Sequence, residues 1–239
     1  MPENGLRVFS RTEMENELIH KIAEIRSRMV HACERAGRSP DSVRLLLASK
    51  TVAPLRIRDA FHAGAELFGE NKVQELVSKL PDLTDLPIEW HFIGQLQSNK
   101  VKQVVPYVRL IHSLDRLSLA EEIQKQAIKF NQSVNVLVEI NSSGEENKGG
   151  IVIDQAESFI RDLRKFDRIR ICGLMTVPVN GTEKQVRDCF RKTKSLFDRI
   201  STLLDDHILS MGMSGDFEWA IEEGSTLIRV GSSVFGQRS

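Results

Sequence analysis

Lys50 is the residue of this sequence best placed to act as a nucleophile. It follows the apolar run at residues 45–48 and Ser49, and strand alternation would place it on the same face as Leu46 and Ala48. An amine at the end of a buried strand is partly desolvated, which favours the uncharged form that attacks a carbonyl group. Taken alone, the run fits equally a strand-end lysine that extends into water, which is the commoner case.

Two strand-like runs near the C-terminus end in glycine and serine. Such glycines let a phosphate approach the backbone, while serine hydroxyls and the N–H groups of the acidic turn after Gly215 donate hydrogen bonds to an anion. Glycine and serine are also ordinary turn residues, but two such loops in succession favour a phosphate site. The residues concerned are Ser210, Gly212 and Ser214 in the first run, and Arg229, Gly231, Ser232 and Ser233 in the second.

An alternating series of strands and helices is expected to position these residues. After a long helical stretch at residues 11–36, short β-like runs alternate with segments of helical periodicity, an order that requires a parallel sheet. The helical segments are expected at 54–63, 72–80, 99–105, 116–130, 153–166, 184–204 and 217–223. The strands are expected at 44–50, 66–71, 88–94, 110–115, 134–141, 169–177, 207–213 and 227–236.

The length of the chain favours a closed barrel over an open sheet. About eight βα units in 239 residues match a single (β/α)8 TIM barrel, whereas doubly wound sheets usually have fewer strands. Function in such barrels lies at the carboxyl ends of the strands, and phosphate commonly binds after strands seven and eight. Lys50 would therefore face the phosphate cup, a pairing that suggests an aldehyde bearing a phosphate, pyridoxal 5′-phosphate (PLP). An alternative is that the barrel binds another phosphorylated metabolite and that Lys50 acts only as a positive charge that holds it.

Composition excludes several other classes of protein. Lys plus Arg and Asp plus Glu each total 33, so the net charge is zero. That balance argues against a nucleic-acid partner and against a polybasic membrane-surface protein. No apolar run is long enough for a membrane span, and the start lacks the apolar core of a signal peptide. Three widely spaced cysteines predict neither a disulfide framework nor a metal knuckle and favour a cytoplasmic location.

The remaining candidates are weaker. His91 and His112 could shuttle protons or contact a cofactor, but hydrogen-bonded core histidines are the simpler interpretation. No histidine or cysteine cluster has ligand spacing, so no metal site is expected. The glycine-rich loop at residues 142–150, with Glu145, Glu146 and Lys148, could be a mobile lid or a solvated loop.

The chain resembles the pyridoxal phosphate homeostasis protein family (the YggS/PROSC type), which shares its barrel with the N-terminal domain of alanine racemase. The resemblance implies a PLP barrel of fold type III with an additional N-terminal helix. It predicts one domain over residues 1–239, in which segment 1–43 packs on the barrel. The matching segments span residues 45–236 and read LLLASKTVAP, ELFGENKVQEL, WHFIGQLQSNKVK, IHSLDR, VEINSSGEENKGG, GLMTVP, LSMGMSGDFEWAI and IRVGSSVFG.

The same resemblance implies a role for each candidate residue. Lys50 would hold PLP as a Schiff base, Asn71 would lie near the cofactor, and Arg229 would sit by the pyridine nitrogen. The phosphate would be held by Ser214, Gly231 and Ser232. The family often has an acidic residue where Gly215 stands and threonine where Ser232 stands; serine keeps the hydroxyl donor.

Two functions from different classes follow. The first is a cofactor carrier or reservoir for intracellular PLP homeostasis, without catalytic residues, acting as a monomer or weak dimer and passing PLP to apo PLP-dependent enzymes. The second is a racemase-like PLP enzyme, which needs a second base opposite the lysine. In the resembling racemases a tyrosine from a further C-terminal domain supplies that base, and a chain ending at Ser239 is expected to lack it; Tyr107 is poorly placed to replace it. The carrier is therefore the favoured function.

Overall fold

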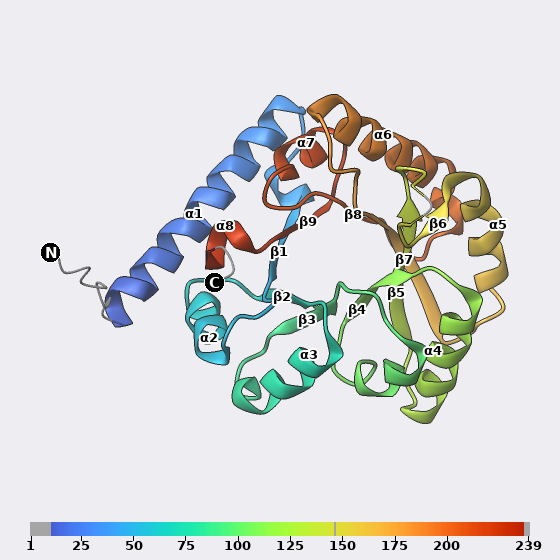
Figure 1. Cartoon of the computed structure of the whole chain (residues 1–239), viewed down its shortest axis with the longest axis horizontal. Helices are drawn as coiled ribbons and strands as arrows, with labels where there is room; N and C mark the ends of the chain where they lie inside the picture. The colour runs from blue at the N-terminus through green and yellow to red at the C-terminus, as the bar shows by residue number, and fades with distance from the viewer. Residues whose placement is uncertain (1–10, 146, 237–239) are drawn as a thin grey trace, which may run out of the picture.

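A closed barrel of parallel strands forms the centre of the molecule (Figure 1). The computed structural model describes residues 11–145 and 147–236. The strand order is β1-β2-β3-β4-β5-β7-β8-β9, and β9 pairs with β1 to close the ring. The strands are β1 (Arg44–Ala48), β2 (Leu67–Glu70), β3 (Glu89–Phe92), β4 (Leu110–Leu114), β5 (Val134–Asn141), β6 (Ile151–Val152), β7 (Ile169–Thr176), β8 (Ile208–Ser210) and β9 (Leu227–Val230).

Helices surround this ring on its outside (Figure 1). The α-helices are α1 (Arg11–Arg35), α2 (Pro54–His62), α3 (Val73–Lys79), α4 (Leu117–Lys129), α5 (Ile153–Leu163), α6 (Glu183–Arg199), α7 (Phe217–Glu222) and α8 (Ser232–Phe235). Short 3₁₀ turns are η1 (Pro40–Ser42), η2 (Leu80–Leu83), η3 (Ser98–Gln103) and η4 (Ser201–Leu203).

The predicted (β/α)8 barrel is confirmed, and each predicted strand run contains one barrel strand. Three details were wrong. Residues 99–105 form a 3₁₀ turn in place of an α-helix, and the two-residue strand β6, which extends the sheet beside β5, was not predicted. The predicted last strand, 227–236, ends at Val230, because the chain turns at Gly231 and forms α8.

Strand alternation divides the apolar side chains into two layers. Leu47, Ile111 and Ile228 face outward into the large core between the barrel and its helices. The interior of the barrel holds two small separate clusters, with Ile208 packed against both. These are Leu46, Ala48, Leu67 and Leu227 in one, and Leu110, Leu137, Cys172 and Met175 in the other. Lys50 continues the inward-facing series of Leu46 and Ala48, as the alternation predicts.

Helix α1 lies along the side of the barrel, against α7, α8 and α2 (Figure 1). It buries Leu18, Ile22 and Ile25, which helical spacing places on one face, and Arg28 pairs with Glu218 at 3.0 Å. Residues 1–10 of the predicted segment 1–43 lie outside the described residues. Although α1 has 25 residues, no helix in the described ranges is long and apolar enough to cross a membrane.

All three cysteines are buried and none forms a disulfide. Burial raises the pKa of the Cys172 thiol to about 11. These buried thiols therefore serve as small apolar side chains.

Candidate cofactor site at the carboxyl end of the barrel

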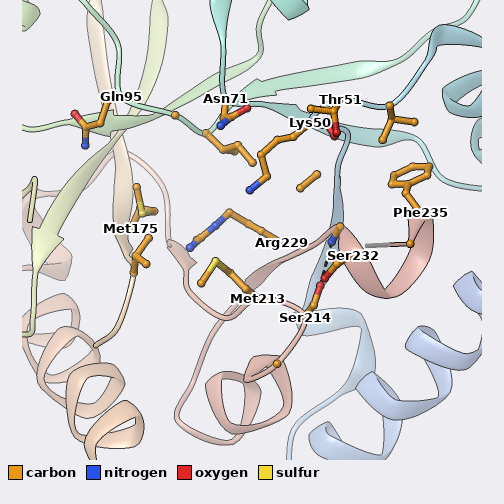
Figure 2. A pocket seen from close by; sticks show the side chains of 18 of the residues that line it. Lys50, Thr51, Asn71, Gln95, Met175, Met213, Ser214, Arg229, Ser232 and Phe235 are labelled. Atoms are coloured by element: carbon orange, nitrogen blue, oxygen red, sulfur yellow. Dashed lines mark hydrogen bonds between the residues drawn. The ribbon is translucent and has the colours of Figure 1, made fainter. Parts of the chain in front are cut away.

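A cavity of about 900 Å³ opens where the carboxyl ends of the strands meet. Figure 2 shows side chains from several strand ends pointing into it. All six residues predicted as cofactor contacts line this one cavity: Lys50, Asn71, Ser214, Arg229, Gly231 and Ser232. Barrel closure explains the result, because it brings the end of β1 next to the end of β9.

Lys50 is carried by a turn in an unusual backbone conformation. The next residue, Thr51, has φ = 61°, a left-handed value that a β-branched residue rarely adopts. Its N–H donates to Glu75 Oε2 at 2.6 Å, which holds the turn against α3. Strain of this kind persists where the surrounding contacts fix the backbone, and it is common at functional sites.

A buried ion pair lies beneath this turn. Lys79 Nζ is 2.6 Å from Glu70 Oε1, and both side chains are buried. Lys79 also donates to the Ser49 carbonyl at 2.9 Å, and the Ser49 hydroxyl donates to Glu70 Oε1 at 2.7 Å. Burial raises the pKa of Glu70, and hydrogen bonds from Lys79 and Ser49 oppose that rise. The network anchors the residue before Lys50 from outside the barrel.

The residues predicted to hold a phosphate lie together in the cavity, where β9 passes close to β1. The N–H of Gly231 donates to Ser214 Oγ at 3.2 Å, which joins the two predicted loops (Figure 2). A Cβ atom on Gly231 would lie 2.9 Å from the Ala48 carbonyl oxygen, so a larger residue would push β9 away from β1. Ser232 then begins α8 at the edge of the cavity, next to Gly231.

Two N–H groups of the acidic turn after Ser214, those of Asp216 and Phe217, donate to the Met213 carbonyl. Asp216 Oδ1 accepts the N–H of Met213 at 2.6 Å, so this N–H is bonded within the loop. Burial raises the pKa of Asp216, while the bond from Met213 and the charge of Arg229 oppose the rise. Asp216 therefore shapes the loop, in which Ser214 and Gly215 line the cavity.

Arg229 projects from β9 into the middle of the cavity, on the side of Lys50 that faces Met213 in the view of Figure 2. It is 5% exposed. Nη1 donates to Ser210 Oγ at 2.6 Å and Nη2 donates to the Thr176 carbonyl at 3.0 Å. Burial lowers the pKa of Arg229 to about 10, and the charges of Asp216 and Glu139 oppose the shift. The cation thus has neutral oxygen partners, and the carboxylates act only through space.

Asn71 follows β2 and presents an unsatisfied polar atom. Its Oδ1 is buried and has no hydrogen-bond partner among the described residues. The neighbouring strand approaches very closely, since a Cβ on Gly94 would lie 2.1 Å from the Asn71 carbonyl oxygen. A buried acceptor without a donor costs free energy unless a ligand or water satisfies it.

Glu139 also lines the cavity, and it was not predicted from the sequence. Of the lining residues that were not predicted, it is the one best suited to acid–base chemistry. It is 8% exposed and accepts a hydrogen bond of 2.6 Å from Gln95 Nε2. Burial raises the pKa of Glu139 to about 7, and the charge of Asp115 adds to the effect. A usable signal existed: in VNVLVEIN, alternation places Glu139 on the same inward face as Leu137. Other missed lining residues are Thr51, Arg56, Gln95, Met175, Met213 and Phe235.

The loop at 142–150 is tied to the end of β5. Asn141 Oδ1 accepts the N–H of Gly144 at 3.0 Å, and Asn141 Nδ2 donates to the Glu145 carbonyl at 2.9 Å. Lys148 Nζ donates to the Pro178 carbonyl at 3.1 Å. Glu146 lies outside the described residues.

The family model described as "Alanine racemase, N-terminal domain" matches residues 22–239. A "Pyridoxal phosphate homeostasis protein" of Aquifex aeolicus is 45% identical over 221 residues, covering 91% of this chain and 97% of its own. The chain belongs to the pyridoxal phosphate homeostasis protein family. The predicted resemblance is therefore confirmed.

Two solved structures are similar to this chain over nearly its whole length. An "unknown protein from Bifidobacterium adolescentis" is 36% identical with a TM-score of 0.88, covering 95% of this chain and 98% of its own. PipY of Synechococcus elongatus PCC7942, solved "with PLP bound", is 32% identical with a TM-score of 0.81, covering 92% of this chain and 100% of its own.

Proposed function

We propose that this protein binds PLP as a Schiff base on Lys50 and serves as a carrier or reservoir in intracellular PLP homeostasis, without a committed catalytic reaction. The observation that carries the proposal is the single cavity into which Lys50, Arg229 and the glycine-serine cup all open. The printed names of the relatives and the PLP-bound PipY structure support the choice of cofactor.

The residues of the cavity fit the two reactive ends of this cofactor. When bound, PLP supplies an aldehyde that condenses with an amine with loss of water, and a phosphate that accepts hydrogen bonds. Lys50 Nζ is the amine at the end of β1. The hydroxyls of Ser214 and Ser232 and the close approach allowed at Gly231 suit the phosphate. The cup needs no basic surface, in keeping with the zero net charge.

Arg229 and Asn71 fit the ring between those two ends. A guanidinium beside the pyridine nitrogen keeps that nitrogen unprotonated, which makes the ring a weaker electron sink than a carboxylate partner would. Such an arrangement stabilises a carbanion less than a carboxylate partner would. The orphaned Asn71 Oδ1 offers an acceptor for a hydroxyl of a bound ring.

A racemase-like enzyme is the second candidate function, and Glu139 is the observation that favours it. Tyr107 is 52% exposed and does not line the cavity. Glu139 does line it, and a carboxyl group with a pKa of about 7 could accept or return a proton near neutral pH. The test is α-proton exchange of L-alanine in deuterated water with PLP-loaded protein. Turnover that disappears in Lys50→Ala and Glu139→Gln would contradict the carrier function.

Titration with PLP tests the proposed function itself. Wild-type protein should develop visible absorbance that saturates, and Lys50→Ala should lose that band. Lys72→Ala is a matched control, because Lys72 follows β2 and its side chain is 65% exposed. A wild type without the band, or a Lys50→Ala protein with an unchanged band, would refute the proposed attachment.

The cellular setting follows from the same function. We propose a cytoplasmic monomer or weak dimer that passes PLP to apo PLP-dependent enzymes and has no nucleic-acid partner. Light scattering of the PLP-loaded protein checks the oligomeric state. Mixing loaded protein with an apo-enzyme and following recovery of the activity of that enzyme checks the transfer.

A further inference from the structure

Four buried or half-buried polar side chains connect Arg229 to the opposite end of the barrel. Arg229 Nη1 contacts Ser210 Oγ at 2.6 Å, and Ser210 Oγ lies 3.2 Å from His112 Nδ1. His112 Nε2 is 2.9 Å from His91 Nδ1, and His91 Nε2 is 3.0 Å from Glu89 Oε1. We call this series, Glu89, His91, His112 and Ser210, the interior chain.

The two ends of the interior chain open into different cavities. Arg229 lines the candidate cofactor cavity of about 900 Å³. Glu89 and His91 line a second cavity, of about 220 Å³, together with Arg44 and Arg109. Since Glu89 begins β3 and Arg229 lies near the end of β9, the chain crosses the inside of the barrel beside its small apolar clusters.

The ends also fix the direction of every hydrogen bond. A guanidinium can only donate, and an ionised carboxylate can only accept. Hydrogen bonds from His91 and Arg44 lower the pKa of Glu89 to about 2, so Glu89 is ionised at neutral pH. Therefore His91 donates through Nε2–H to Glu89 and accepts at Nδ1.

The same logic gives the donor and the acceptor of each remaining hydrogen bond in the interior chain. His112 donates through Nε2–H to His91 and accepts at Nδ1 from the Ser210 hydroxyl, whose oxygen accepts from Arg229. Burial lowers the pKa of His91 and lowers that of His112 well below its usual range, so both rings are neutral. The prediction that these are hydrogen-bonded core histidines is confirmed, but their bonds lead to a residue of the cofactor cavity.

We propose that the interior chain is a set of positioning residues that orients the guanidinium of Arg229 towards the bound cofactor. The inference rests on the proposed function for its ligand and on the described contacts for its geometry. Ser210 Oγ accepts from Arg229 and directs its own proton to His112 Nδ1, which keeps a lone pair of the oxygen turned to Arg229. With one N–H held by Ser210 and one by the Thr176 carbonyl, the plane of the guanidinium is fixed where Arg229 lines the cavity.

Ser210→Ala is the direct test, and Ser225→Ala is its matched control. Both serines are fully buried, but within the described part of the chain Ser225 Oγ bonds only to backbone carbonyls, those of Leu209, Met211 and Leu227. Ser210→Ala removes the hydroxyl that accepts from the Arg229 cation, so it should weaken PLP binding at least about tenfold. Ser225→Ala should stay within about twofold of wild type.

Nitrogen NMR of the unliganded protein gives a second readout that needs no cofactor. In wild type and Ser225→Ala, both His91 and His112 should carry the proton on Nε2, and rotation of the Arg229 Nη groups should be slow. In Ser210→Ala the Arg229 rotation should become fast. An Nδ1–H tautomer or a charged ring at His112 in wild type would overturn the proposed chain.

The results separate this inference from the proposed function. If wild type gains no PLP absorbance, the proposed function is wrong. The tautomers of His91 and His112 then still show whether the interior chain has the proposed hydrogen bonds. If wild type binds PLP and the two serine variants bind it equally well, the positioning role is wrong while the function stands. If Ser210→Ala does not fold, the tautomers of His91 and His112 and the rate of Arg229 rotation in wild type decide whether the proposed interior chain is correct.

Discussion

Lys79 and Arg229 are both buried cations near the carboxyl end of the barrel, but their partners differ. Lys79 lies outside the barrel and contacts the Glu70 carboxylate at 2.6 Å. Arg229 lies inside and contacts a hydroxyl and a carbonyl oxygen. A directly paired charge is neutralised locally and supports structure, whereas a charge with neutral partners stays available to a ligand. The first network positions the Lys50 turn, and the second presents Arg229 to the cavity.

Removing Lys79 should have the largest effect on stability. Lys79→Met leaves the Glu70 carboxylate buried without its partner, and breaking such a pair costs about 3–5 kcal/mol. Urea unfolding of the apo protein measures the loss. In the double variant Glu70→Gln with Lys79→Met, no buried charge remains, so most of the stability should return. Failure of the double variant to recover would show that the pair supplies more than charge balance.

Glu139→Gln should increase stability at high pH, because Glu139 is buried without a contacting cation. The folded pKa of Glu139, about 7, lies above the ordinary value of about 4.5. The contribution of Glu139 to the free energy of unfolding is therefore fully present below about pH 4.5 and is lost as the pH rises through 7. The variant should gain about 3 kcal/mol over wild type at pH 8 and nothing at pH 4.5. Urea unfolding at the two pH values checks this, and a gain independent of pH would contradict the shift.

Arg229→Met should separate binding from stability. Its neutral partners imply a change in unfolding free energy within about 1 kcal/mol, because removing the cation also removes its desolvation cost. Loss of a charge-assisted contact should weaken PLP binding at least about tenfold. Unfolding and titration of the same preparation measure both effects. A stability loss as large as that of Lys79→Met would remove the distinction between the two cations.

Thr51→Asn should have the smallest effect. Asparagine tolerates the left-handed conformation better than a β-branched residue, so the variant should gain about 0.5–1 kcal/mol. Thr84, which is exposed and has φ = −65°, provides the control Thr84→Asn, with no expected gain. Equal effects in the two variants would show that the Lys50 turn stores no strain.

The fold and most of the cavity were predictable because they depend on short-range patterns. Alternation placed Lys50 on the inward face, and the order of elements placed Gly231 and Ser232 beside it. The end of the last strand at Val230 was not predictable, since it depends on how closely Gly231 packs on Ala48. The bond from Met213 to Asp216 likewise depends on the loop's three-dimensional course.

The interior chain shows the limit of sequence patterns most clearly. His91, His112 and Ser210 each occupy an inward position that alternation predicts, but they come from β3, β4 and β8. Whether they touch depends on the register and tilt of strands that are far apart in the sequence. Glu139 was missed for a related reason, because its pKa depends on burial and on Asp115.

Borohydride reduction of the PLP-loaded protein, followed by peptide mass spectrometry, tests the central claim most directly. Reduction makes the bond between the cofactor and its amine permanent, so the modified residue can be identified. A single phosphopyridoxyl group on Lys50, absent from Lys50→Ala and retained in Lys72→Ala, is the predicted result. Modification spread over exposed lysines, or none on Lys50, would contradict the account.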